Sequence, residues 1–290
     1  MFLGFSTVSL GVKLSIFKFN KIAIFESLDE VDRTTGREVF DDLEVQKILN
    51  IGGLDTSFSK IQNKKEFINL LKKLKEEAHS LGIYPIIHID AHGNDKGIKL
   101  GENSHIEWRE LLEFLSELNL SMKGNLLVVL ASCFGANIIR HISATSRAPF
   151  WGVIAPYEET YPGNIYDGLI RFYTAICSGK NSEDILSSLN TIENSNDLKL
   201  FTAEYFFVKA TELAVSKFLS VGSIDKRIEK IIPDQNKNSD QFTKSTMQLK
   251  SEFIAEQKCK FEESLMYFML VDLYPKNTNK ISKVHNPWSL

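Results

Sequence analysis

The sequence has few cysteines, no strong excess of charge of either sign and no uninterrupted hydrophobic run long enough to cross a membrane. Only three cysteines, Cys133, Cys177 and Cys259, occur in 290 residues. An odd number of widely spaced cysteines argues against a disulfide framework and favours a reducing compartment. The formal net charge of -3 gives no electrostatic reason to expect a nucleic-acid partner.

The N-terminal residues 1–19 are mildly apolar but lack the positive leader and small-residue cleavage site of a signal peptide. Lys13 and Lys18 interrupt this stretch well before it reaches membrane-spanning length. We therefore expect a short strand or hairpin here, with a poor signal peptide as the weaker alternative. The expected location is the cytoplasm, with no membrane partner.

Several motifs of common enzymes are absent. Ser132 cannot form a nucleophile elbow, because Leu130 and Phe134 occupy the two glycine positions of G-x-S-x-G. Neither standard glycine-rich phosphate loop occurs, so nucleotide binding has no support. Residues 90–92 (Asp-Ala-His) resemble the start of the D-A-H-x-D metal motif of manganese ureohydrolases, but position 94 is Asn and the second aspartate-rich motif is missing. We expect no metal and no organic cofactor.

The alternation of apolar runs and amphipathic stretches predicts an α/β fold with a mostly parallel sheet. Continuous apolar runs of the parallel-sheet type predict strands; they cover 21–25, 84–91, 125–132 and 150–155. Apolar residues at helical spacing predict helices; they cover 40–49, 64–80 and 164–178. Between the second and third strands, 96–103 suggests a small hairpin. Ser104 with Glu107 then suggests a capping box that opens another helix.

The last third of the chain has helical composition. Residues 182–192, 200–219 and 241–273 read as helices, and 234–240 as a polar linker or exposed loop. We expect a core over residues 1–195 and a helical C-terminal region over 196–290. That region either packs on the core or binds a partner protein.

Two predicted strands end in reactive side chains, His92 and Cys133. Ligand sites of open parallel sheets form beyond the carboxyl ends of the strands, so the two side chains face one another if these strands are neighbours. An imidazole can accept the proton of a thiol and later protonate a leaving amine. The backbone N–H groups of Gly93 and Cys133 are candidate oxyanion donors. The bland alternative is a buried core cysteine and a histidine that merely ends a strand.

Other polar residues near these strand ends are weaker candidates. Asp90 shares a strand face with His92 and could contact substrate or orient a neighbour. Glu158 and Glu159 follow the fourth strand and could border a pocket that favours a basic residue, although a solvated loop fits them equally well. His88 fits a core histidine with a hydrogen-bond partner. Cys177 and Cys259 fit structural positions on helices.

The segments YPIIHIDAHGNDKGIKLGENSHIEWRELLEFL and NLLVVLASCFGANI resemble the core of the caspase–separase–CHAT superfamily, and the CHAT branch most of all. Members carry an apolar strand into His-Gly, a short hairpin, a helix, and an apolar strand into a small residue and Cys. The resemblance covers about residues 20–215 and matches His92, Gly93 and Cys133 to the family positions. It implies a caspase-like three-layer α/β/α sandwich and a cysteine endopeptidase.

The resemblance also has two departures. Many relatives place Asp two residues before the Cys, where it lines the primary specificity pocket, but this chain has Ala131. Asp90 stands where small or apolar residues are common. The implied reaction is cleavage of a protein substrate through a thioester on Cys133 with His92 as general acid and base. We expect a partner or a signal to regulate it, and an activating or inhibitory protein could bind through the C-terminal helices. The alternative is a catalytically inactive interaction module.

Overall fold

The computed structural model describes residues 19–49, 54–189, 198–219, 240–281 and 286–288. The N-terminal stretch 1–18 and the linker expected at 234–240 lie outside this part, apart from Asp240. Among the described residues, no helix combines the length and apolar character that a membrane span requires.

A six-stranded sheet forms the centre of the molecule, in the order β2-β1-β3-β6-β7-β8. All neighbouring strands are parallel except β7 and β8, which are antiparallel. The strands are β1 Lys21–Ser27, β2 Asp55–Lys60, β3 Pro85–Ala91, β6 Leu127–Ala131, β7 Gly152–Ala155 and β8 Lys199–Thr202. A separate antiparallel hairpin joins β4 Gly97–Lys99 to β5 His105–Glu107.

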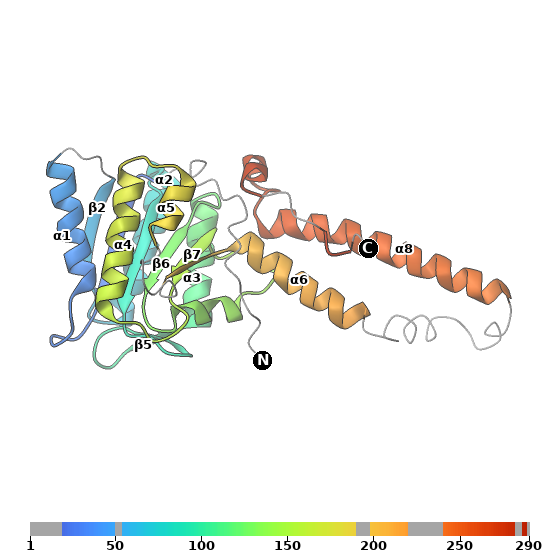
Figure 1. Ribbon diagram of the computed structural model, residues 1–290, viewed down its shortest axis with the longest axis horizontal. Coiled ribbons are helices and arrows are strands. Elements are labelled where there is room, and N and C mark those ends of the chain that lie inside the picture. Colours follow the sequence, from blue (N-terminus) through green and yellow to red (C-terminus); the bar gives the residue numbers. More distant parts are fainter. Residues whose placement is uncertain (1–18, 50–53, 190–197, 220–239, 282–285, 289–290) are drawn as a thin grey trace.

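Helices cover both faces of this sheet (Figure 1). They are α1 Thr35–Ile48, α2 Lys64–Leu81, α3 Trp108–Ser121, α4 Pro162–Cys177 and α5 Ser182–Ser187, with the 3₁₀ segment η2 Gly135–His141 after β6. One apolar core lies between the sheet and α1, α4 and α5, and the other between the sheet and α2 and α3. Because both faces are buried, the central strands are apolar throughout. The predicted α/β class with a mostly parallel sheet is confirmed.

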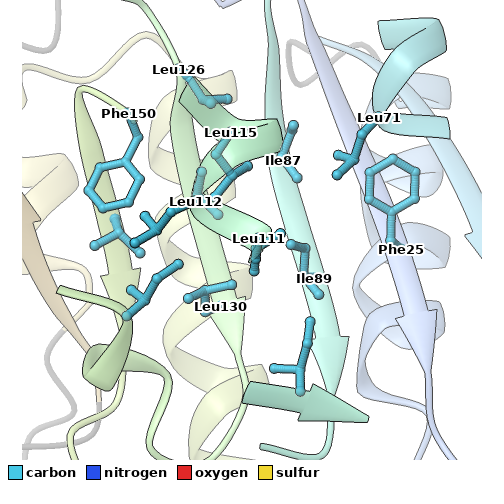
Figure 2. Packing of buried hydrophobic residues seen from close by; sticks show 14 of the residues in the cluster. Phe25, Leu71, Ile87, Ile89, Leu111, Leu112, Leu115, Leu126, Leu130 and Phe150 are labelled. Carbon is cyan, nitrogen blue, oxygen red and sulfur yellow. The ribbon is translucent and has the colours of Figure 1, made fainter. Parts of the chain in front are cut away.

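Figure 2 shows the second core, where side chains of β1, β3 and β6 meet those of α2 and α3. Ile87 and Ile89 of β3 point to this side, whereas Ile86 belongs to the opposite core. Both faces of β3 are thus filled, and this fixes which side chain of the strand faces which layer.

The helical C-terminal region consists of α6 Ala203–Leu219 and α8 Asp240–Phe268, followed by the 3₁₀ turn η4 Pro275–Lys280. The two long helices reach away from the sheet, α8 extending farthest (Figure 1). Rings hold them together: Phe207 of α6 lies 5.5 Å from Phe261 and 5.1 Å from Phe268 of α8 between centroids.

Two local predictions are wrong. Residues 105–107 form β5 because they pair with β4, so α3 begins at Trp108 and the Ser104–Glu107 capping box does not form. Ser104 Oγ instead accepts a hydrogen bond from the Lys64 backbone N–H at 3.0 Å. Residues 200–202, expected to begin a helix, belong instead to the sheet edge β8. The sheet therefore takes a strand from beyond the boundary expected at residue 195.

Candidate functional site

The candidate site lies at the carboxyl ends of β1, β3 and β6. The chain passes from β1 outward to β2 and returns to β3 on the other side, so the strand order reverses between β1 and β3. Crevices at such reversal points are the usual ligand sites of open α/β sheets. The loop after β1 supplies Asp29 and Asp32, β3 leads into His92, and β6 leads into Cys133.

His92 and Cys133 follow neighbouring strands in matching register. Asp90 of β3 pairs with Ala131 of β6, and each reactive residue stands two positions farther along its strand. The backbone of Gly93 is pressed against the other strand's end: a Cβ placed on it would lie 2.1 Å from Ser132 Oγ and 2.6 Å from the Cys133 carbonyl oxygen. Only glycine permits this approach.

The imidazole of His92 is half exposed and is held by a carboxylate. Its Nε2 lies 2.7 Å from Asp32 Oδ2 and 4.0 Å from Asp29 Oδ2. Partial burial pushes the pKa of Asp32 upward, but the hydrogen bond with His92 and the one from the Asp29 backbone outweigh it, so the pKa is lowered. Lys99 of β4 contacts both carboxylate oxygens of Asp29, at 2.7 and 2.8 Å.

The thiol of Cys133 is partly buried and lies near the loop after β7. Its Sγ is 3.9 Å from the Thr160 carbonyl oxygen. Within the described part of the chain, no hydrogen bond joins this thiol to His92. The next residue, Phe134, has a left-handed backbone with φ of 59°. That conformation costs a non-glycine residue roughly 1–2 kcal/mol, so strain is stored beside the thiol, as often happens at functional sites.

Among the described residues, the backbone N–H groups of Gly93 and Cys133 at this rim have no acceptor. Gly93 lies opposite Ile98 in an isolated antiparallel bridge, but neighbouring residues make its hydrogen bonds. The Lys99 N–H donates to the His92 carbonyl, and the Asn94 N–H donates to the Gly97 carbonyl. The N–H of Gly93 itself, and that of Cys133, bond to no described residue. These are the two N–H groups that the sequence suggests as oxyanion donors, and that role stays a prediction.

Asp90 lies in the interior rather than at the rim. It is 3% exposed and accepts a hydrogen bond from the Thr35 hydroxyl at the start of α1. Burial raises its pKa to about 7, the Thr35 hydrogen bond opposes the rise, and the charge of Glu26 adds to it. The nearby Glu26 accepts a hydrogen bond from the Arg37 backbone N–H at 2.9 Å. Asp90 thus anchors α1, and the structure does not bring it to the thiol.

His88 is fully buried and stacks on Tyr173 of α4, with ring centroids 5.9 Å apart. The hydrogen-bond partner expected for it is absent, because neither ring nitrogen has one among the described residues. Burial lowers the pKa of His88 to about 3, so the ring is neutral at neutral pH.

Glu158 and Glu159 are exposed on the loop that follows β7. The Glu158 carbonyl accepts a hydrogen bond from the Phe134 N–H at 3.3 Å, which ties this loop to the Cys133 turn. Neither carboxylate forms an ion pair with a residue in the described ranges. The loop borders the thiol, as its position in the sequence suggested.

The other two cysteines lie on helices, as predicted. Cys177 ends α4 and is partly buried, and burial raises the pKa of its thiol. Cys259 lies on α8 and is exposed. A packing role therefore suits Cys177 but not Cys259.

Sequence reasoning missed Asp29, Asp32, Lys99 and Thr160 as site residues. The signal for the aspartates was their place in a polar loop directly after the first strand of a parallel sheet. Ligand atoms of Asp29, Asp32 and His92 lie within 4.8 Å of one another, close enough to share a cation. Lys99 already balances the charge of Asp29, so the cluster is satisfied as an ion-pair network.

No protein-family model matches the chain, and no curated protein matches it significantly.

Proposed function

We propose that this protein is a caspase-like cysteine peptidase in which Cys133 is the nucleophile, His92 the general acid and base, and Asp32 the group that orients the imidazole. One observation carries the proposal: His92 and Cys133 stand in register at the carboxyl ends of the adjacent parallel strands β3 and β6, where Gly93 approaches the Cys133 backbone. A nucleophile, a base and an orienting third group form the usual arrangement for covalent catalysis.

The order of elements also supports the proposal. An apolar strand ending in His-Gly, the β4–β5 hairpin, the helix α3 and a second apolar strand ending in Ser-Cys follow one another. This is the order that the resemblance to the caspase–separase–CHAT superfamily implies. The sheet with helices on both faces suits the implied three-layer sandwich.

The contact with Asp32 decides which nitrogen of His92 acts as the base. An ionised carboxylate can only accept a hydrogen bond, so His92 donates its Nε2–H to Asp32 and the Nδ1 lone pair remains for the thiol. Nδ1 takes the thiol proton and Sγ attacks the peptide carbonyl carbon. The N–H groups of Gly93 and Cys133 bind the resulting oxyanion. The C–N bond then breaks, Nδ1 protonates the leaving amine, and water hydrolyses the thioester with His92 again as base.

The resting arrangement supports regulation of this activity. The thiol points toward the Thr160 carbonyl, with Sγ 3.9 Å from its oxygen. Catalysis requires Sγ to leave this contact and turn to His92. We infer that a protein partner bound to the C-terminal helices promotes this change, and Glu158 and Glu159 favour a basic residue in the substrate.

A second candidate is an inactive interaction module of the same fold. It is favoured by the missing thiol–imidazole hydrogen bond and by apolar side chains exposed on the C-terminal helices, namely Leu213, Met266 and Tyr267. In this case α6 and α8 bind the partner, and His92 and Cys133 catalyse no reaction.

Site-resolved alkylation distinguishes the two. The rates at which iodoacetamide modifies Cys133, Cys177 and Cys259 are measured by mass spectrometry in the wild type and in His92→Ala. A peptidase requires that the Cys133 rate falls at least tenfold in the variant while the other two rates stay constant. An unchanged Cys133 rate contradicts it. A substrate screen in lysate, with and without candidate partners, then compares the wild type with Cys133→Ala.

A further inference from the structure

A second concave site lies between η2, the edge strand β8 and the helix α6. The cavity has a volume of about 460 Å³, within the range of small-molecule sites. Its walls are mostly apolar and aromatic. Tyr157 packs edge-on against Phe201 with centroids 5.0 Å apart, and Ala210 and Leu213 of α6 also line the cavity.

One cation in this wall, Arg140, has no acidic partner among the residues that the structure describes. Arg140, from η2, lines the cavity and is exposed, and no carboxylate of the described residues pairs with it. Burial raises the pKa of the Tyr157 hydroxyl, and the charge of Arg140 opposes that rise. The positive charge of the guanidinium is therefore close enough to influence a polar group of the cavity wall. The acidic lining residue Glu212 is held by Lys209 at 2.6 Å.

We propose that this cavity binds an amphipathic monoanion, a fatty carboxylate whose chain packs among the aromatic and aliphatic walls and whose headgroup pairs with Arg140. Apolar walls with a few placed polar groups are the usual composition of such sites. A guanidinium binds a carboxylate through two parallel N–H donors. The site is separate from the proposed dyad and does not depend on it.

The cavity shares two segments with the Cys133 turn. Ala136, in its wall, donates its N–H to the Pro156 carbonyl at 2.9 Å, and Phe134 bonds to the Glu158 carbonyl. Tyr157 lies between these two acceptors in the sequence and lines the cavity. A bound chain that packs on Ala136 and Tyr157 therefore stabilises the resting turn and slows the reaction of Cys133.

Calorimetric titration of the full chain with decanoate and with decanol tests the site. The two probes share an alkyl chain and differ in charge. We expect Arg140→Ala to weaken decanoate about tenfold and to leave decanol unchanged. Ala210→Phe fills the cavity and removes binding of both. Arg171→Ala, an exposed arginine on α4, is the matched control and binds like the wild type.

Absence of decanoate binding to the wild type overturns the proposal, as does equal binding to wild type and Arg140→Ala. Retention of both probes by Ala210→Phe places them elsewhere and also overturns it. Because Arg140 is exposed, we expect Arg140→Ala to keep the fold. This variant therefore tests the proposal even if circular dichroism shows that Ala210→Phe is unfolded. A separate measurement tests the effect of the cavity on the thiol. We expect saturating decanoate to slow alkylation of Cys133 severalfold. An unchanged rate contradicts this effect but not binding in the cavity.

Discussion

Asp32 and His92 are joined at the carboxyl ends of the strands by a 2.7 Å contact between Oδ2 of Asp32 and Nε2 of His92. The two residues are 60 positions apart in the sequence and belong to the loops after β1 and β3. Their contact places a carboxylate on Nε2 of the imidazole, which in the proposed mechanism leaves Nδ1 for the thiol. This relationship makes the candidate dyad a three-residue arrangement.

Replacing Asp32 tests the orienting role. Asp32→Asn keeps the shape but lets the amide donate to Nε2, which reverses the tautomer and removes the lone pair from Nδ1. We expect the alkylation rate of Cys133 at neutral pH to fall by about tenfold to a hundredfold. The matched control, Asp41→Asn, changes an exposed aspartate that pairs with Arg37 and leaves the rate unchanged. A rate equal to that of the wild type in Asp32→Asn would remove Asp32 from the site.

Gly93 has no room for an added methyl group. Gly93→Ala places a Cβ against Ser132 Oγ and the Cys133 carbonyl, so the strand ends must separate. We expect a loss of about 1–3 kcal/mol in the free energy of unfolding, measured by urea denaturation, and slower alkylation of Cys133. In the control Gly163→Ala, the new Cβ meets only the flexible end of Arg33 at 3.2 Å. It changes stability by less than about 0.5 kcal/mol. Equal losses in the two variants would contradict the close approach.

His88 makes the fold sensitive to acid. Its pKa is lowered by burial to about 3 in the folded state, below the ordinary value of 6.5, so the folded protein resists protonation and the unfolded chain does not. Stability is therefore intact above about pH 6.5 and falls as the pH drops toward 3. His88→Leu removes this term, on the order of 2–3 kcal/mol near pH 4.

Urea denaturation at several pH values measures the effect of His88. The stability difference between His88→Leu and wild type shifts in favour of the variant as the pH falls. His79→Gln, at an exposed histidine on α2, serves as the control and shows no comparable trend. A pH-independent difference for His88→Leu would contradict the assignment.

Asp90 changes the stability of the fold with pH in the direction opposite to His88. Burial raises its pKa to about 7, above the ordinary value of 3.8, so the folded state holds a proton that the unfolded chain releases. The wild type therefore loses stability from this group as the pH rises from about 4 to about 7. Asp90→Asn, which cannot ionise, gains on the wild type by a few kcal/mol across this window. Denaturation curves at pH 4, 5, 6 and 7 follow the gain. An exposed control, Asp95→Asn, shows none, and a flat Asp90→Asn difference would refute the burial argument.

Local patterns sufficed for most of the architecture. The apolar runs at 84–91 and 125–132 identified β3 and the strand β6, because strands buried on both faces must be apolar throughout. The polar strand β2, DTSFSK, escaped notice since an edge strand needs no continuous apolar run. The local pattern predicts helix for residues 105–107 and 200–202, but pairing with β4 and β7 makes them strands.

By itself, the sequence determined the class of fold and nominated the residues at two strand ends, because hydrophobic periodicity and strand order are local properties. Only the tertiary structure decided what meets at that rim. It brought Asp32 to His92 from 60 positions away, withdrew Asp90 into the interior beneath α1, and turned the Cys133 thiol toward Thr160. Such contacts depend on how loops from different strands fold over one edge of the sheet, which no spacing along the chain encodes.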